Sequence, residues 1–245
     1  MPWKIGIIGT GNVASFWVKT LSNFPELDIC VKGFTSSKTD FFIENQKVNP
    51  LKDNTEVDFF LLAVNNDAID NVLQELPTKI PVFICAGFHA TTLSHAGYMY
   101  PLQSIHLMDL PELKEVPFLV EFNADIAEIG RKFLAYIGAK YQETTTKNRQ
   151  LAHTAAVFLN NFSYFICKEG FRLLPPDISK ELFKPIVKKT FDNIFINKAL
   201  QTGPARRKDI KMIQEQQEFL QLNHPEVAEL YRTMTELIQQ KYHEL

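Results

Sequence analysis

Two glycines follow an apolar run near the start of the sequence. The stretch reads IGIIGTGNVA, and its glycines, Gly9 and Gly11, come directly after a strand-like segment, Lys4–Ile8. In this G-x-G-x-x-A spacing the first glycine permits a tight turn, the second leaves room beside the backbone, and Ala14 lets a following helix lie close to the strand. The stretch therefore predicts a strand–turn–helix unit, which points to an α/β fold for the first part of the chain.

Strand-like and helical segments alternate through the first 145 residues. Several strand-like runs are almost continuously apolar, as expected for strands covered on both faces of a parallel sheet. This alternation is typical of a doubly wound, Rossmann-type α/β domain with right-handed crossovers. The expected strands are Lys4–Ile8, Leu27–Phe34, Val57–Val64, Val82–Ala86, Pro117–Phe122 and Ala139–Glu143, and the expected helices are Val13–Asn23, Asp67–Glu75 and Ala124–Ile137, the last capped by Asn123 and ended by Gly138.

From about Thr144 onward the sequence carries helical patterns and no convincing strand. We therefore expect two domains, a Rossmann dinucleotide-binding domain over residues 1–145 and a smaller all-α domain over 146–245. Within the second part, Leu151–Lys168 is apolar nearly all round, the pattern of a central, buried helix. The expected helices are Lys147–Phe171, Ser179–Ala199, Pro204–Leu222 and His224–His243, the last two opened by proline, which suits a first helical turn.

The glycine turn is either a binding site for a diphosphate or a turn without a ligand. A helix that starts directly after it would offer unpaired N–H groups and the positive end of its dipole to an anion. Because the turn follows the first strand of an α/β domain, we favour dinucleotide binding. The expected contacts are Gly9, Thr10, Gly11, Asn12 and Val13.

The end of the second strand distinguishes between nucleotides. An NAD enzyme usually carries an acidic residue there to hold the ribose hydroxyls. Here no acidic residue follows the expected second strand until Asp40; instead Thr35, Ser36, Ser37 and Lys38 offer hydroxyls and a positive charge that suit a 2′-phosphate. NADP is therefore favoured over NAD, although the segment also fits a simple polar loop. The missing acid also disfavours an S-adenosylmethionine-binding methyltransferase.

Two further strands end in small or amide-bearing residues. Ligands of open α/β sheets bind outside the carboxyl ends of the strands. Val64, Asn65 and Asn66 follow one strand and Ala86-Gly87 another, so we expect them to flank the nicotinamide ribose and ring. The alternative is that Asn66 or Asp67 only caps the next helix.

Three polar side chains lie on the apolar helix that starts near residue 151. In a regular helix Asn160 lies within about 20° of His153 around the helix axis and Asn161 within about 80°. Both asparagines are about two turns, or about 10–12 Å, from His153 along the axis. They would line one wall of a cleft, with His153 as a proton donor because a histidine pKa lies near neutrality. The alternative is a set of buried polar groups satisfied by neighbouring backbone.

The composition argues against several classes of partner. A formal net charge of −2 gives no basic surplus for nucleic acid, and no apolar run approaches the roughly 20 residues of a membrane span. Cys30, Cys85 and Cys167 form no metal-binding pattern, so we expect no metal and a reduced, cytoplasmic protein. The remaining histidines, expected as surface or capping residues, are His89, His95, His106, His224 and His243.

Several segments together resemble a family of NADP oxidoreductases similar to pyrroline-5-carboxylate reductase and to deazaflavin (coenzyme F-420)-dependent NADP reductases. The most specific of them are LAHTAAVFLNNF at 151–162 and QTGPARRKD at 201–209. Others are IGIIGTGNVA, LLAVNNDAI, ICAGFHATTL, MYPLQSI and VPFLVE, so that the resemblance spans almost the whole chain. It implies a Rossmann-like domain followed by a small helical domain like the C-terminal domain of 6-phosphogluconate dehydrogenase.

The resemblance also implies site residues and an assembly. It places His153, Asn161, Thr202 and Arg207 around a cleft between the domains, whereas regular helix geometry prefers Asn160, and it implies a homodimer through the helical domain. On charge pattern alone, the arginine pair near Arg207 fits a solvated helix start. The sequence departs from related β-hydroxyacid dehydrogenases, which carry a catalytic lysine where Val157 stands, and from the HPLQ-like turn of the family, which reads MYPLQ here.

The function expected from these features is NADP(H)-dependent hydride transfer. The substrate would be a small C=N or C=O compound, positioned by Gln103, Asn160, Asn161, Thr202 and Arg207. The alternative is a catalytically silent NADP-binding sensor or scaffold, because the lysine is missing and the proton donor is uncertain.

Overall fold

The computed structural model describes residues 3–33, 41–43, 46–50, 56–196 and 200–242. Its contacts divide the chain into two compact units, Met1–Asn161 and Phe162–Leu245. The boundary expected near residue 145 lies at the start of the helix that forms the end of the first unit.

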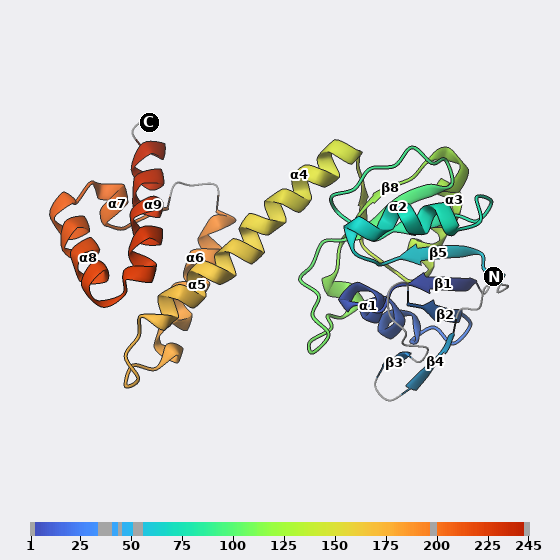
Figure 1. Cartoon of the computed structure of the whole chain (residues 1–245), viewed down its shortest axis with the longest axis horizontal. Coiled ribbons are helices and arrows are strands. Elements are labelled where there is room, and N and C mark those ends of the chain that lie inside the picture. The colour runs from blue at the N-terminus through green and yellow to red at the C-terminus, as the bar shows by residue number, and fades with distance from the viewer. Residues whose placement is uncertain (1–2, 34–40, 44–45, 51–55, 197–199, 243–245) are drawn as a thin grey trace. The chain divides into compact units, whose positions relative to one another are not determined.

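The first unit is built on a sheet with strand order β3-β4-β2-β1-β5-β6-β7-β8-β9. Adjacent strands are parallel except for the β3–β4 and β7–β8 pairs, and Figure 1 shows β2, β1 and β5 side by side. The strands are β1 Lys4–Ile8, β2 Asp28–Lys32, β3 Phe41–Ile43, β4 Gln46–Pro50, β5 Phe59–Leu62, β6 Val82–Ile84, β7 Ala96–Pro101, β8 Phe118–Glu121 and β9 Tyr141–Glu143.

Helices cover both faces of this sheet. On one face α1 (Asn12–Leu21) and α3 (Ala124–Tyr136) share a core in which the Trp17 ring lies 5.2 Å from that of Phe118 and 6.0 Å from that of Phe133, between centroids. On the other face α2 (Asn66–Glu75) packs its apolar side chains against β5 and β6. The expected doubly wound parallel sheet is confirmed.

The chain reverses its direction of winding at β1. It runs from β1 to β2 on one side and then returns to β5 on the other side of the same strand. In open α/β sheets the carboxyl ends of strands at such a switch point form the ligand-binding crevice. The turn that contains Gly9 and Gly11 is therefore at the position where this class of fold binds its ligands.

The expected strands are all present, most with ends shifted by a few residues, but β3, β4 and β7 were not expected. The sequence of β7, AGYMYP, contains glycine and proline, which are depleted in strands. The helix α3 begins after Asn123 as expected, yet the Asn123 side chain does not cap it. Its amide donates to the carbonyl oxygens of Leu93 (3.0 Å) and Ala96 (2.7 Å) instead, and so ties the start of α3 to the loop before β7.

The long helical segment after β9 consists of three parts. They are α4 (Thr146–Ala156), a π-helical turn (Val157–Phe162) and α5 (Ser163–Arg172). The expectation that this segment is buried is wrong for the single chain, since Phe158 is 61% and Tyr164 66% exposed. An apolar pattern predicts that a helix face is buried, but it does not identify the element or molecule that buries it.

The rest of the second unit is helical, as expected. The single helix expected over Pro204–Leu222 is wrong: it is interrupted at Lys208, whose φ is +58°, and restarts with the Asp209 carboxylate accepting from the Met212 amide. The elements are η3 Lys180–Phe183, α6 Lys184–Ile194, α7 Pro204–Arg207, α8 Ile210–Asn223 and α9 Pro225–Lys241. Among the described residues, no helix is long and apolar enough to cross a membrane.

Candidate functional site

The turn between β1 and α1 depends on its first glycine for steric reasons. Gly9 has a φ of +126°, and a Cβ atom at this position would overlap the carbonyl oxygen of Ala63 at the end of β5. The Gly9 amide also donates to the Lys32 carbonyl at 2.8 Å. The turn is therefore held between the ends of β2 and β5, and only glycine fits there.

The second glycine has a different environment. A Cβ atom on Gly11 would meet no heavy atom of the described part of the chain within 4 Å, and the φ of Gly11, −86°, is open to any residue. Gly11 is the N-cap of α1, and no side chain caps the helix. The first turn of α1 thus presents backbone N–H groups beside open space, which is the arrangement that binds phosphate.

Asn12, the first residue of α1, connects this turn to a loop far along the chain. Its Oδ1 accepts from the Leu107 amide at 3.2 Å. The same loop contains Gln103, whose side-chain amide donates to the Glu115 carbonyl (2.9 Å) and whose Oε1 accepts from the Ser104 amide (2.8 Å). Gln103 therefore shapes its own loop in this structure, and its role as a substrate contact stays a prediction.

The ends of β5 and β6 are also linked to each other. The Asn66 side chain donates to the Phe88 carbonyl at 3.3 Å, across the gap between the two turns. The N-cap position of α2 is occupied by Asn65 rather than by Asn66 or Asp67, and Asn65 makes no side-chain hydrogen bond there. Val64, Asn65 and Asn66 thus lie beside the turn that carries Ala86 and Gly87.

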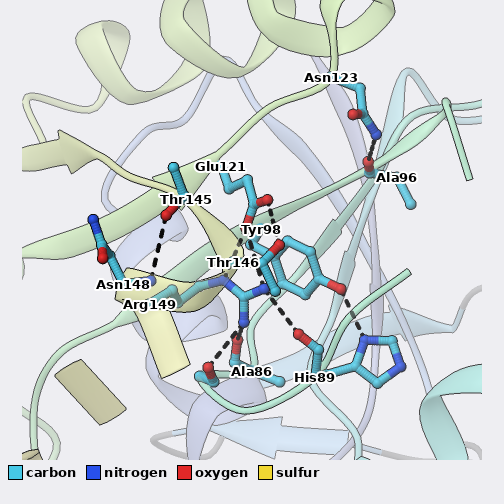
Figure 2. Close-up of polar contacts among 11 residues, drawn as sticks. Ala86, His89, Ala96, Tyr98, Glu121, Asn123, Thr145, Thr146, Asn148 and Arg149 are labelled. Atoms are coloured by element: carbon cyan, nitrogen blue, oxygen red, sulfur yellow. Dashed lines mark hydrogen bonds and ion pairs between the residues drawn. The ribbon is translucent and has the colours of Figure 1, made fainter. Parts of the chain in front are cut away.

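A fully buried arginine fixes the turn after β6. Arg149, on the second turn of α4, donates to the carbonyl oxygens of Ala86 (3.2 Å), Gly87 (2.9 Å) and His89 (2.8 Å). It also donates to the Glu121 carboxylate, at 3.2 and 3.3 Å. Figure 2 shows this guanidinium between the Glu121 side chain and the backbone of the β6 turn. The charge is thus compensated and its donors are used, as burial requires.

The same cluster anchors the start of α4. Thr146 donates through its hydroxyl to the other carboxylate oxygen of Glu121 at 2.6 Å, and Thr145 caps the helix by accepting from the Asn148 amide. Beside the guanidinium, the Tyr98 hydroxyl forms a hydrogen bond of 2.9 Å with Nδ1 of His89, drawn as a dashed line in Figure 2. His89 is therefore a largely buried member of a network, and the expectation of a surface or capping role is wrong.

His153 lies against the β6 turn one helical turn after Arg149. A Cβ atom on Gly87 would lie 2.7 Å from Cγ of His153 and would overlap Nδ1, so the imidazole rests directly on the Gly87 backbone. Its Nδ1 is 3.0 Å from the hydroxyl of Tyr100 on β7. Burial, and secondly the charge of Arg149, lower the pKa of His153 below its usual value, and burial raises the pKa of Tyr100.

The π-helical turn decides which asparagine shares a face with His153. A π-helix closes its hydrogen bonds from i to i+5, so it accommodates one more residue per turn than an α-helix. After such a turn, residue i+8 takes the face that residue i+7 would have taken. Asn161, rather than Asn160, is therefore the one aligned with His153, because the extra residue lies between Val157 and Phe162. Both asparagines are exposed in the chain.

The remaining predicted residues lie elsewhere. Thr35, Ser36, Ser37 and Lys38 are outside the described residues, so the expected 2′-phosphate contacts stay a prediction. Thr202 and Arg207 belong to the second unit, where Thr202 lines a hollow of about 470 Å³ together with residues of α6 and Tyr242. Among the described residues, no group of three or more His, Cys, Asp and Glu side chains could hold a metal ion.

Two residues of the site were missed by the sequence reasoning. Arg149 carried a usable signal, because it stands four residues before His153 on a helix and needs a buried carboxylate such as Glu121. Tyr100 stands in the MYPLQ segment, at a position where nothing in the sequence indicates that it contacts His153. Its strand was not expected, so its side chain had no predicted position.

The comparisons with known proteins place the chain in a family. Residues 116–238, half of the chain, match the family of the domain of unknown function DUF2520, and the chain belongs to this family. No curated protein sequence matches it.

Solved structures share its fold over nearly the full length. One is a protein from Bacteroides fragilis named "putative NADP oxidoreductase", with a TM-score of 0.75, 20% identity and 98% of both chains covered. Another is protein TM1727 from Thermotoga maritima, with a TM-score of 0.64, 20% identity and the same coverage. A third is an imine reductase from Streptomyces aurantiacus, with a TM-score of 0.60, 11% identity and 96% and 95% covered. At these identities the similarity establishes the fold, a Rossmann-type domain followed by a helical one.

Proposed function

We propose that the protein is an NADP(H)-dependent oxidoreductase that acts on a small C=N or C=O substrate. The single observation that carries this proposal is the pair of glycines at the start of α1. Gly9 is required by the fold, whereas no heavy atom of the described residues lies within 4 Å of the place that a Cβ atom on Gly11 would take. A diphosphate on the N-terminus of α1 explains that space, since it requires a close approach to the backbone.

The residues around this turn fit the other parts of a dinucleotide. Thr10 lies in this turn, and Asn12 and Val13 are the first residues of α1. The turns after β5 and β6, with Asn65 and Gly87, lie at the adjacent strand ends. A nicotinamide bound there would supply the hydride and accept it in the reverse direction. His153, resting on Gly87, would supply the proton to the nitrogen or oxygen of the substrate, and Asn161 would position that substrate.

The preference for NADP over NAD rests on the sequence after β2. Lys32 ends that strand, and the residues that follow it offer hydroxyls and a positive charge rather than a carboxylate. The printed name of the Bacteroides fragilis protein, which mentions NADP, is consistent with this choice.

Cofactor binding is tested first and turnover second. NADPH, NADH and S-adenosylmethionine are each titrated, with the melting temperature as the measurement, because a specific ligand raises it by mass action. NADPH oxidation is then followed with a panel of cyclic imines, aldehydes and ketones. We expect NADPH to stabilise the protein more than NADH and one class of the panel to be reduced. Binding without turnover over the whole panel would favour a silent sensor or scaffold, and no binding would overturn both.

A variant pair separates the enzyme from the sensor. His153→Ala removes the proposed proton donor and leaves the glycine turn intact. If the protein is an enzyme, this variant should lose turnover while its NADPH affinity stays within about twofold of the wild type. Asn161→Ala should lower turnover by a smaller factor and likewise leave the NADPH affinity unchanged. A sensor has no turnover to lose, so the two variants would differ from the wild type only in stability.

We also propose that the protein is a homodimer assembled through the helical unit. Among the described residues of 162–245, the buried apolar side chains are Leu220, Val227 and Ala228. A unit of this size needs a larger apolar core to be stable, because even small domains bury on folding about 60% of the surface that the unfolded chain exposes. Light scattering on a sizing column should give twice the mass of one chain, and a monomer at micromolar concentration would contradict the assembly.

A further inference from the structure

The hydrogen bond between Tyr100 and His153 constrains the chemistry of the imidazole. A neutral histidine carries one ring proton, and the partner of one nitrogen determines which nitrogen holds it. Here Nδ1 faces the Tyr100 hydroxyl at 3.0 Å, and the two rings meet edge to face at 5.4 Å between centroids. The ring is thus oriented by a partner that is itself a proton donor.

Two observations favour the tyrosine as the donor in this bond. Burial raises the pKa of Tyr100, so its hydroxyl keeps its proton, and burial beside the charge of Arg149 keeps His153 neutral near pH 7. If Nδ1 donated instead, the phenolic proton would need another acceptor, and among the described residues Nδ1 is the only partner recorded for this hydroxyl. Donation by Tyr100 satisfies both groups with one bond.

We propose that Tyr100 is a positioning residue for His153: its hydroxyl donates to Nδ1 and so leaves the ring proton on Nε2. The inference rests on the proposed function, because it assigns the proton that the proposed reduction needs. Nε2–H is then the group that donates to the oxygen or nitrogen of a bound C=O or C=N group. A neutral imidazole can polarise such a group without first gaining a charge.

The same contact accounts for the proton balance. When hydride adds to the substrate carbon, the π electron pair moves to the oxygen or nitrogen, which takes the proton from Nε2. A ring that gives up this proton must gain one at Nδ1, and the Tyr100 hydroxyl is 3.0 Å away. The ring is then neutral with its proton on Nδ1. Uptake of a solvent proton at Nε2, with return of the Nδ1 proton to the phenolate oxygen of Tyr100, restores the starting tautomer, so that the net proton comes from solvent.

Gly87 is part of the same arrangement. The imidazole lies on the Gly87 Cα, at a distance that leaves no room for a side chain, and Arg149 holds the Gly87 carbonyl at 2.9 Å. The backbone at Gly87 therefore contacts one face of the His153 ring, while the hydrogen bond from Tyr100 orients the ring plane and selects the tautomer. Three elements, β6, β7 and α4, thus determine where the Nε2 proton points.

The tautomer is measurable without a substrate. The ¹⁵N chemical shifts of the two ring nitrogens, in protein labelled at histidine, report which one is protonated, and His153→Gln identifies the signals. We expect a single tautomer with the proton on Nε2 in the wild type and an average of both tautomers in Tyr100→Phe. Tyr136→Phe, which removes a surface hydroxyl bonded to Glu26, is the matched control and should leave the signals of His153 unchanged.

Two further measurements complete the test. Tyr100→Phe should bind NADPH within about twofold of the wild type, yet lower kcat for the substrate class found in the panel by at least about tenfold. A wild-type ring with its proton on Nδ1 would overturn the inference and leave the proposed function standing. Absence of NADPH binding would overturn the proposed function, whereas the tautomer result, obtained on the free protein, would be unaffected.

Discussion

The guanidinium of Arg149 lies over the ring of Tyr98, with 3.5 Å between Cζ and the ring centroid. Both side chains are buried, and burial raises the pKa of Tyr98 to about 12, so the ring faces the cation as a neutral phenol. The contact places a cation over the negative face of an aromatic ring, which is favourable where water is excluded. Arg149 lies on α4, the helix that also carries His153 one turn further on.

Arg149→Met should strongly destabilise the first unit. The substitution removes the donor to three backbone carbonyls and leaves the Glu121 carboxylate without its cationic partner. Breaking such a pair costs about 3 kcal/mol or more, and we expect the melting temperature to fall by about 10 °C. Arg131→Met is the matched control, because its pair with Glu143 is exposed and screened by solvent, so its loss should barely change the melting temperature. Equal shifts in the two variants would contradict the role of Arg149.

Gly11→Ala should reduce NADPH affinity without reducing stability, whereas Gly9→Ala should reduce stability. Gly11 has an ordinary φ and open space at its Cβ position, so the alanine variant should fold with nearly unchanged melting temperature. Its methyl group occupies the place proposed for the diphosphate, and NADPH affinity should fall by at least about tenfold, or about 1.4 kcal/mol. Gly9→Ala should lower the melting temperature, because its methyl group overlaps the Ala63 carbonyl at a positive φ. Unchanged NADPH affinity in Gly11→Ala would contradict the proposed site.

The parts of the fold that the sequence predicted are those that local pattern determines. The strand Lys4–Ile8 has the expected ends, because its apolar run is followed directly by the Gly9 turn. The strand β7 was missed because its residues gain strand geometry only from pairing with β6 and β8. Local propensity at Gly97 and Pro101 argues against a strand, and tertiary pairing overrides it.

The candidate site could be predicted from the sequence only at positions where a single residue type, recognisable without its partners, reveals the local structure. Glycines at the turn are recognisable because few residues can replace them. The Tyr100–His153 pair joins positions 53 residues apart in the sequence, and Arg149 reaches carbonyls that any residue could supply. Such partners depend on the register of β7 and on the rotation of α4, and neither can be derived from the local pattern.

The free energy of unfolding should depend on pH through His153. Its pKa lies below 6.5 in the folded state, where burial and Arg149 disfavour the charged ring, and near 6.5 in the unfolded chain. The unfolded state therefore binds more protons as the pH falls below 6.5, and stability decreases until the folded-state pKa is reached. The melting temperature, measured between about pH 7.5 and 5.5, should fall less in His153→Gln than in the wild type. Parallel curves would contradict a lowered pKa at His153.

Asn161→Ala should reduce turnover more than Asn160→Ala. In a regular helix Asn160 would share the face of His153, but the π-helical turn over Val157–Phe162 inserts one residue and moves Asn161 onto that face. An amide aligned with the Nε2 proton can hold the same substrate atom, whereas one rotated by about 100° points along a different direction. We expect kcat/KM to fall by about tenfold or more in Asn161→Ala, and NADPH affinity measured by titration to stay within about twofold in both variants. A larger loss in Asn160→Ala would show that the face of the helix follows α-helical rather than π-helical geometry in solution.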